Sequence, residues 1–324
     1  MRPFLHFSAQ TIDDAVLMLR NYGDKAYVVA GGTDLLGKMK DQILPTYPEA
    51  LIDIKTIPDL DAIHIENGVT RIGSLTTLEA ITKNETIKAK YPALARAAGR
   101  AASPHLREMG TIGGNICQDI RCWYYRNPNN RFPCLRKGGG RCYAIEGDNR
   151  FHSIFGGSVN EGCYAVHPSD AAPALVVLGS EVKTTKRTIP IDDLFSVRVQ
   201  KTTVLDSDEI VTEIHLPPPQ AGTKSAFLKF ALRTSIDFSI VNCAAAVNII
   251  EDKVTAVRIC LNAVYVTPYR AARTEEFLEG KPLDDATIEA ASDIAVSAAQ
   301  PMSRNRYMVQ IARTMVKRTL SACR

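Results

Sequence analysis

Long apolar runs are absent from this sequence of 324 residues. Nowhere do about 18 apolar residues follow one another, so we expect no transmembrane helix. The N-terminal stretch MRPFLHFSAQTIDDA also lacks the apolar core of a signal peptide. We therefore expect a cytoplasmic protein with no membrane partner. In that compartment the eight cysteines should mostly be thiols, metal ligands or buried apolar groups, not disulfides.

Net charge and histidine are also scarce. The formal charge of +4 is small for this length, whereas nucleic-acid-binding proteins are usually more basic, so we expect no nucleic-acid partner. Only six histidines are present, and no Ser-His-Asp or Cys-His constellation stands out. The sequence therefore offers no candidate catalytic residues of these kinds. His105, His152 and His167 lie near the motifs described below and are expected to be surface or backbone-bonded residues.

The residues that are present are those of a globular protein, with 45% hydrophobic and 23% charged residues. The chain is too long for one ordinary core, so we expect two or three packed units. PPPQAG, residues 217–222, is the clearest boundary, because prolines neither extend a helix nor pair in a central strand. After it, three strand-like runs are followed by patterns that predict two helices, and the last two runs suggest an antiparallel hairpin.

Local patterns predict several elements before this boundary. TIDDAVLMLRNYG predicts a helix, and IHIENGVTRIGSL predicts a hairpin that turns at Asn67-Gly68. TTLEAITKN predicts a helix start with a capping box formed by Thr76 and Glu79. ALVVLGSEVKTT, residues 174–185, has a strand pattern.

The stretch VVAGGTDLLGKMK contains most of a nucleotide-triphosphate loop, with Gly32, Gly37 and Lys38 at the required spacing. Met39 stands where that loop needs a magnesium-binding Ser or Thr, so ATP hydrolysis is disfavoured. What remains is a strand, two glycines and a helix start, which allow close backbone approach and favour an anion. The alternative is a strand-to-helix turn that only needs small residues.

A second stretch of the same kind, GTIGGN, occupies residues 110–115. Two Thr/Gly loops about 80 residues apart could enclose one dinucleotide from two sides. Neither loop has the G-x-G-x-x-G spacing, so a Rossmann site is disfavoured.

Three ordered motifs, VVAGGTDLL, GTIGGNICQ and HPSDAAPAL, resemble those of the FAD-binding subunit of molybdenum hydroxylases, the xanthine dehydrogenase and carbon monoxide dehydrogenase family. The resemblance covers essentially the whole chain. It implies an α+β, vanillyl-alcohol-oxidase-type (PCMH-type) fold. The expected domains are an α/β subdomain at 1–56, a larger α+β subdomain at 57–216, and a C-terminal domain at 217–324. FAD would lie between the first two, and the third would hold a three-stranded antiparallel sheet with helices.

The resemblance also implies which residues contact FAD. The first loop would contribute Val28, Val29, Ala30, Gly31, Gly32, Thr33, Asp34 and Leu35, and the second would contribute Thr111, Gly113, Gly114 and Asn115. Asp170 would contact the ribityl chain or nearby polar groups, Lys229 would lie close to the flavin ring, and Val211 would touch the ring. Without the resemblance, Asp170 reads as a helix N-terminal carboxylate and Lys229 as a solvated charge on an edge strand.

An aperiodic insertion at 121–164 contains Cys122, Cys134, Cys142 and Cys163. It has no C-x2-C pair, and its spacing matches neither common zinc sites nor ferredoxins, so spacing alone indicates a four-thiolate site without naming the metal. Arginines and aromatic residues surround these cysteines. They would stabilise and shield an anionic cluster, or form a single-strand nucleic-acid surface, which the low net charge disfavours. The remaining cysteines, Cys117, Cys243, Cys260 and Cys323, are interpreted as packing residues.

The insertion is similar to that of a subset of the family, the flavin subunits of 4-hydroxybenzoyl-CoA reductase and bacterial aldehyde oxidoreductase. The resemblance implies that the four insertion cysteines bind an additional [4Fe-4S] cluster. The gap before Cys163 is closer to the aldehyde-oxidoreductase type.

By the same resemblance, this chain passes electrons between partner clusters, its FAD, and the additional cluster or an external acceptor. The implied partners are a large subunit with molybdopterin and a small subunit with two [2Fe-2S] clusters, in a dimer of heterotrimers. Two alternatives stay open. One is a stand-alone flavin oxidoreductase of the same fold, and the other is a zinc-stapled, non-enzymatic interaction module.

Overall fold

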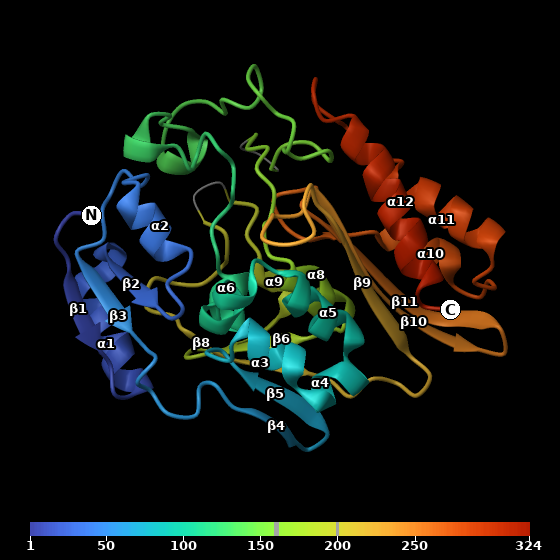
Figure 1. Ribbon diagram of the computed structural model, residues 1–324, viewed down its shortest axis with the longest axis horizontal. Helices are drawn as coiled ribbons and strands as arrows, with labels where there is room; N and C mark the ends of the chain where they lie inside the picture. The colour runs from blue at the N-terminus through green and yellow to red at the C-terminus, as the bar shows by residue number, and fades with distance from the viewer. Residues whose placement is uncertain (159–161, 199–200) are drawn as a thin grey trace.

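A computed structural model describes residues 1–158, 162–198 and 201–324 of the chain. The described residues form three sheets, which follow one another across the molecule in the order of the sequence (Figure 1). The described residues of the insertion, 121–158 and 162–164, run along the upper side of this view, from the N-terminal unit to the C-terminal helices. In the described part of the chain, no helix is long and apolar enough to cross a membrane.

The N-terminal unit is a small parallel sheet with helices packed beside it. Its elements are β1 (Leu5–Ser8), α1 (Ile12–Tyr22), β2 (Ala26–Val29), α2 (Leu35–Lys40) and β3 (Ala50–Asp53). The strand order is β1-β3-β2, with both pairs parallel. Thr11 caps α1 by accepting a hydrogen bond from the Asp14 N–H, and α1 buries Ala15 and Leu19 in the core of this unit. Because the strands are parallel, the loop after β2 leaves the sheet at the same edge as the carboxyl ends of β1 and β3.

The central unit combines an antiparallel sheet with short helices. Its strands are β4 (Ile63–Glu66), β5 (Val69–Gly73), β6 (Glu181–Thr184), β7 (Thr188–Pro190) and β8 (Val211–Leu216). Its helices are α3 (Leu78–Lys83), α4 (Glu85–Lys90), α5 (Pro92–Arg100), α6 (Pro104–Met109), α7 (Ile112–Ile116), α8 (Ala171–Val177) and α9 (Ile191–Leu194). The strand order is β4-β5-β8-β6-β7, and β4 and β5 form the predicted hairpin.

Two local predictions for the central unit were wrong. Residues 174–177 belong to α8, so only 181–184 of the predicted strand run is a strand. The N-cap of α3 is Thr77, which accepts from the Ala80 N–H, whereas the Thr76 hydroxyl donates to the Asp61 carbonyl. Two adjacent threonines offered the same local pattern, and the tertiary contact of Thr76 decided between them.

The C-terminal unit is an antiparallel sheet with helices on one face. Its elements are β9 (Lys224–Phe230), β10 (Val241–Ile250), β11 (Lys253–Asn262), β12 (Tyr269–Arg270), α10 (Ala272–Leu278), α11 (Asp285–Val296) and α12 (Tyr307–Ser321). The three predicted strands and the β10–β11 hairpin are present, in the order β12-β11-β10-β9. β12 and α10 were not predicted, because they are too short to show a period.

The insertion contains little regular structure among its described residues, namely the 3₁₀ turns Pro128–Asn130 and Leu135–Lys137. It is held at both ends of the molecule. The Asn129 N–H donates to the Asp41 carbonyl of the N-terminal unit. On the other side, Asn305 Nδ2 donates to the His152 and Ser153 carbonyls, just before α12. The insertion therefore connects the first and third units.

Candidate functional site

A cavity of about 500 Å³, called the central cavity below, lies between the N-terminal and central units, and residues 236–238 of the C-terminal unit line part of it. Its volume is in the range of small-molecule and cofactor sites. Fourteen of the fifteen residues expected to contact FAD line this cavity. They are Val28, Val29, Ala30, Gly31, Gly32, Thr33, Asp34, Leu35, Thr111, Gly113, Gly114, Asn115, Asp170 and Val211.

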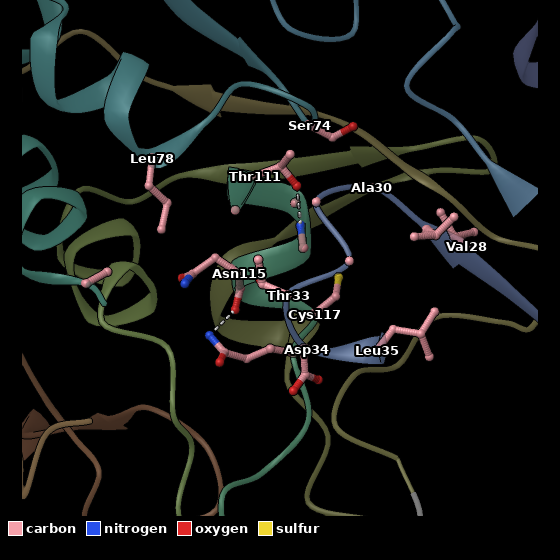
Figure 2. Close-up of a pocket in the computed structure, with 18 of the residues that line it drawn as sticks. Val28, Ala30, Thr33, Asp34, Leu35, Ser74, Leu78, Thr111, Asn115 and Cys117 are labelled. Carbon is pink, nitrogen blue, oxygen red and sulfur yellow. Dashed lines mark hydrogen bonds between the residues drawn. The ribbon is translucent and has the colours of Figure 1, made fainter. Parts of the chain in front are cut away.

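The first glycine loop follows β2 and leads into α2 (Figure 2). Gly32 has a φ of 69°, a left-handed conformation that favours glycine. Gly31 lies against the backbone of the second loop, because a Cβ built at this position would overlap the Met109 carbonyl oxygen. The two loops therefore touch through backbone atoms, and Gly31 permits that contact.

The second glycine loop starts α7. Thr111 caps this helix, since its hydroxyl oxygen accepts from the Gly114 N–H at 3.2 Å (Figure 2). Gly113 lies against Ser74 at the end of the β4–β5 hairpin, where a Cβ would come within 2.9 Å of the Ser74 Cβ. Asn115 Oδ1 accepts from the Ser169 hydroxyl at 2.5 Å, which ties this loop to the start of α8.

Two buried polar atoms of the cavity lining have no hydrogen-bond partner within the described chain, Ser74 Oγ and Arg121 Nε. Arg121 Nη2 forms an ion pair with Asp34 Oδ1 at 3.1 Å, and the guanidinium carbon lies 4.4 Å from the centre of the Phe238 ring. Burial lowers the pKa of Arg121 to about 10, with a further contribution from Arg126 and opposition from Asp34. The cavity thus offers unsatisfied donors to a polar ligand.

Asp170 and Lys229 form a buried pair beside the cavity. Lys229 Nζ donates to Asp170 Oδ2 at 2.6 Å and to the Arg100 carbonyl, and both side chains are about 95% buried. Asp170 Oδ1 accepts from Ser239 and Asn242. Asp170 is the N-cap residue of α8, as the simple structural interpretation expected, although it is the Ser169 hydroxyl that accepts from the Ala172 N–H. Lys229 is buried, so its interpretation as a solvated charge was wrong. Asp170 lines the central cavity, whereas Lys229 is not among the described residues that line it.

Lys38, the apparent ATP-loop lysine, also lines the cavity, but its Nζ lies 3.4 Å from Asp119 Oδ2 and 4.0 Å from Asp34 Oδ2. Met39 is 1% exposed and packs with Leu35 and Leu51 in the N-terminal unit. Lys38 is therefore already paired within the protein, and Met39 serves the core.

Several lining residues were missed. Arg121, Ile236 and Phe238 are the main ones, and Ile236 and Phe238 come from the loop between β9 and β10. That loop has no period and no glycine motif, so nothing in the sequence pointed to it. Arg121 was noted only as one of several cations near the cysteines.

A second, smaller cavity, called the cysteine cavity below, lies inside the insertion. Cys122, Cys134, Cys142 and Cys163 all line it, as expected for one four-thiol site. Tyr124, Tyr125, Leu135, Tyr143 and other apolar groups complete the lining. Within the described residues, no three His, Cys, Asp or Glu side chains are arranged around a single metal ion. The thiols therefore surround a space and do not converge on one point.

Cations lie next to these thiols. Arg136 lines the cysteine cavity with a side chain that is 2% exposed. Arg136 Nη1 and Lys137 Nζ are buried without a hydrogen-bond partner in the described chain. Burial lowers the pKa of Lys137, and Cys134 and Cys122 oppose that shift. Arg136 pairs through Nη2 with Asp119 and Thr202, but its Nη1 and Lys137 Nζ remain without a hydrogen-bond partner. Buried cationic nitrogens of this kind are costly, so the surroundings of the four thiols favour an anionic occupant.

The histidine predictions had mixed outcomes. His105 is exposed, as expected. His152 and His167 are buried: His152 Nε2 lies 3.2 Å from Cys122 Sγ, and the His167 ring packs edge-on against Phe195. Burial lowers the pKa of His167 to about 3, which keeps it neutral.

The packing interpretation of the other cysteines was confirmed for three of them. Cys243, Cys260 and Cys323 are fully buried in the cores of the central and C-terminal units. Cys117 is half-buried and lines the central cavity (Figure 2). Its pKa is raised to about 12 by burial, so the thiol is neutral there.

Two family models match the chain. The FAD binding domain in molybdopterin dehydrogenase matches residues 2–219, and the CO dehydrogenase flavoprotein C-terminal domain matches residues 226–323. The chain is therefore a member of the family of FAD-binding subunits of molybdenum hydroxylase-type oxidoreductases.

Individual relatives agree with this assignment. The carbon monoxide dehydrogenase medium chain of Hydrogenophaga pseudoflava is 28% identical over 98% of this chain and 96% of its own length. The aldehyde oxidoreductase FAD-binding subunit of Escherichia coli is 31% identical over 99% of this chain and 97% of its own. A solved structure of the Hydrogenophaga pseudoflava carbon monoxide dehydrogenase superposes with a TM-score of 0.78, covering 100% of this chain and 98% of that one, at 28% identity.

Proposed function

We propose that this chain is the electron-transfer subunit of a molybdenum hydroxylase-type complex and that its central cavity holds FAD. The cavity volume, the two touching glycine loops and the unsatisfied Ser74 and Arg121 atoms support this assignment. Bound FAD accepts electrons in pairs and passes them on singly. The protein's part is to orient the flavin between the loops and to exclude water with the apolar residues Val211 and Phe238.

We further propose that Cys122, Cys134, Cys142 and Cys163 bind a [4Fe-4S] cluster. The observation that carries this proposal is that all four thiols line one cavity, beside the buried nitrogens Arg136 Nη1 and Lys137 Nζ, which have no hydrogen-bond partner in the described chain. In a four-iron cluster each thiolate binds its own iron, so sulfur atoms that surround a space suit it better than a single ion. The relative named as an aldehyde oxidoreductase FAD-binding subunit is of the type whose insertion this one resembles.

The partners would be a molybdopterin-binding large subunit and a small subunit with two [2Fe-2S] clusters, in a dimer of heterotrimers. Electrons would pass between the partner clusters, the FAD and the additional cluster or an external acceptor. We place the complex in the cytoplasm, because eight free thiols suit a reducing compartment. We also propose domains at 1–56, 57–216 and 217–324, since each range contains one of the sheets of the described chain.

The test is an anaerobic EPR spectrum of the dithionite-reduced protein, with FAD and iron quantified on the same sample. We expect about one FAD and about four irons per chain, with a cluster signal that the Cys134→Ser variant loses. The Cys243→Ser variant is the matched control, since Cys243 is buried in another core and its replacement should keep the signal. FAD without iron would reject the cluster, and folded protein without FAD would reject the flavin site.

A further inference from the structure

Asp119 lies between the central cavity and the cysteine cavity. Its carboxylate is 3.4 Å from Lys38 Nζ, which lines the central cavity. The same carboxylate is 3.7 Å from the Arg136 guanidinium and accepts from the Tyr125 hydroxyl, and both residues line the cysteine cavity. The Thr202 hydroxyl donates to Asp119 at 3.1 Å and accepts from Arg136 at 3.2 Å. One side chain therefore contacts the walls of both cavities.

The connection continues into the first glycine loop. The Asp119 N–H donates to Asp34 Oδ2 at 3.0 Å, and Asp34 lines the central cavity. Arg126 donates to Asp34 Oδ1 at 2.7 Å and to the Asp119 carbonyl oxygen at 2.9 Å. Because these contacts share atoms, a shift of Asp119 moves the supports of both cavities together.

Cationic side chains outnumber carboxylates around Asp119. Five cations, Lys38, Arg121, Arg126, Arg136 and Lys137, lie on or between the cavity walls. Among the described residues, these cations form ion pairs with only two carboxylates, those of Asp34 and Asp119. Burial acts to raise the pKa of Asp119, but Lys38, Arg136 and Arg126 outweigh it and hold this pKa well below its usual range. Arg136 and Lys137 are buried and the other three cations are half-buried. Such an excess of cations suits an anionic group on each side, such as a pyrophosphate and a thiolate-bound cluster.

We infer that Asp119 is a positioning residue shared by the two cofactor sites, which sets the positive field on both by pairing Lys38 on one side and Arg136 on the other. This inference rests on the proposed function, because it needs a flavin in one cavity and a cluster in the other. A group that gains an electron gains negative charge, which nearby unpaired cations stabilise. Removal of the Asp119 charge therefore favours the reduced form of both groups at once.

The experiment uses the whole complex carrying the isosteric variant Asp119→Asn, purified anaerobically. FAD and iron are quantified first. Redox titrations followed by flavin absorbance and by EPR then give the midpoint potentials of the flavin and the cluster. We expect both potentials to shift to more positive values in the variant.

Two matched variants control for a general charge effect. Asp148→Asn removes a carboxylate of the insertion that pairs with Arg150, and Asp237→Asn removes one that lines the central cavity and pairs with Arg233. Each lies near one site, so each should move at most one potential. If Asp119→Asn does not fold, both midpoint potentials are measured in Thr202→Val instead, and the criterion is again whether both shift. This variant removes the half-buried hydroxyl that joins Asp119 to Arg136.

The outcomes distinguish a failure of the proposed function from a failure of the shared role of Asp119. A wild-type complex without iron or without FAD rejects the proposed function. A wild-type complex that holds both, together with a variant in which only one potential moves or neither does, overturns the shared role of Asp119. A positive shift of both potentials, with single or no shifts in the two control variants, supports it.

Discussion

Gly31 lets two loops of the candidate site meet because it has no side chain. Its place in the motif indicates a phosphate-binding role, but its nearest neighbours are backbone atoms of Met109 and Gly110 in the second loop. The residue is small because two loops meet there. Gly37 lies in α2, just after the same loop, and a Cβ built there has no other atom within 4 Å. Packing therefore does not require a glycine at position 37.

We expect Gly31→Ala to weaken FAD binding by about tenfold, which corresponds to about 1.4 kcal/mol, because the added methyl group must push the loops apart. Gly37→Ala is the matched control within α2 and should keep FAD affinity while stabilising the helix by up to about 1 kcal/mol. Titration of FAD into flavin-free protein, followed by flavin fluorescence, measures both. Equal affinities for the two variants would contradict the contact between the loops.

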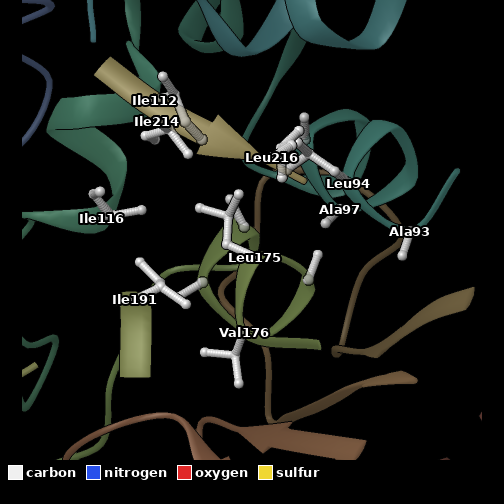
Figure 3. Packing of buried hydrophobic residues seen from close by; sticks show 14 of the residues in the cluster. Ala93, Leu94, Ala97, Ile112, Ile116, Leu175, Val176, Ile191, Ile214 and Leu216 are labelled. Atoms are coloured by element: carbon white, nitrogen blue, oxygen red, sulfur yellow. The ribbon is translucent and has the colours of Figure 1, made fainter. Parts of the chain in front are cut away.

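At the scale of elements, α8 marks the limit of what the sequence predicts. All residues from Ala171 to Val177 are buried, so the helix is apolar all round and shows no 3.6-residue period. Figure 3 shows the reason: Leu175 points toward side chains of α5, α7 and β8, whereas Val176 points away from them on the other side of the helix, and both are buried. A short apolar run of this kind fits a buried strand equally well, and only the tertiary surroundings separate the two.

The candidate sites divide in the same way. The resemblance of three local motifs led to the expectation that the glycine loops and Asp170 lie together, and they line one cavity. The four cysteines occur in one aperiodic segment, and they line a second cavity. Ile236, Phe238 and the link through Asp119 could not be predicted, because they depend on how distant segments pack. The fold class was predicted correctly, since it is confirmed by the family models and the superposition, whereas β12 and α10 were too short to detect.

The β6–β7 turn is joined to the start of β8 by Glu209, whose carboxylate accepts from Thr184 and from Arg187. Burial raises the pKa of Glu209, but the bonds to Arg187, Thr184 and the Asp206 backbone outweigh it and lower this pKa below its ordinary value of 4.5. A carboxylate with a lowered pKa in the folded state contributes stability above the unfolded value and loses it as pH falls through the folded value.

The chain should therefore lose part of its stability as pH falls below about 4.5, and Glu209→Gln should remove that part of the dependence. Thermal unfolding between pH 7 and pH 3.5 measures the change. Wild type should be the more stable protein at pH 7, and the difference should shrink in acid. A difference that stays constant over this range would show that Glu209 acts through packing and not through its charge.

At the scale of the whole molecule, the central cavity is lined by residues from all three units. A ligand bound there contacts each of them and stabilises their mutual arrangement. At a free concentration of 100 times its dissociation constant, a ligand that binds only the folded state adds about 2.7 kcal/mol. FAD should therefore raise the unfolding temperature of the flavin-free protein and merge any separate transitions into one.

Differential scanning calorimetry with and without FAD tests this expectation. Riboflavin is a useful control ligand, because it lacks the pyrophosphate and adenosine that the glycine loops are proposed to hold. A transition that FAD leaves unchanged, alongside one that it shifts, would mean that one unit does not take part in binding.

The order of these segments along the chain also determines when the cofactor site can form during synthesis. A ribosome completes the first 216 residues while Ile236 and Phe238 of the central cavity, and the Asn305 side chain that holds the insertion, have not been made. Domains generally fold as they emerge, the N-terminal ones first. The central cavity nevertheless stays unfinished until the last third of the chain has folded against it, so FAD loading belongs to the end of synthesis.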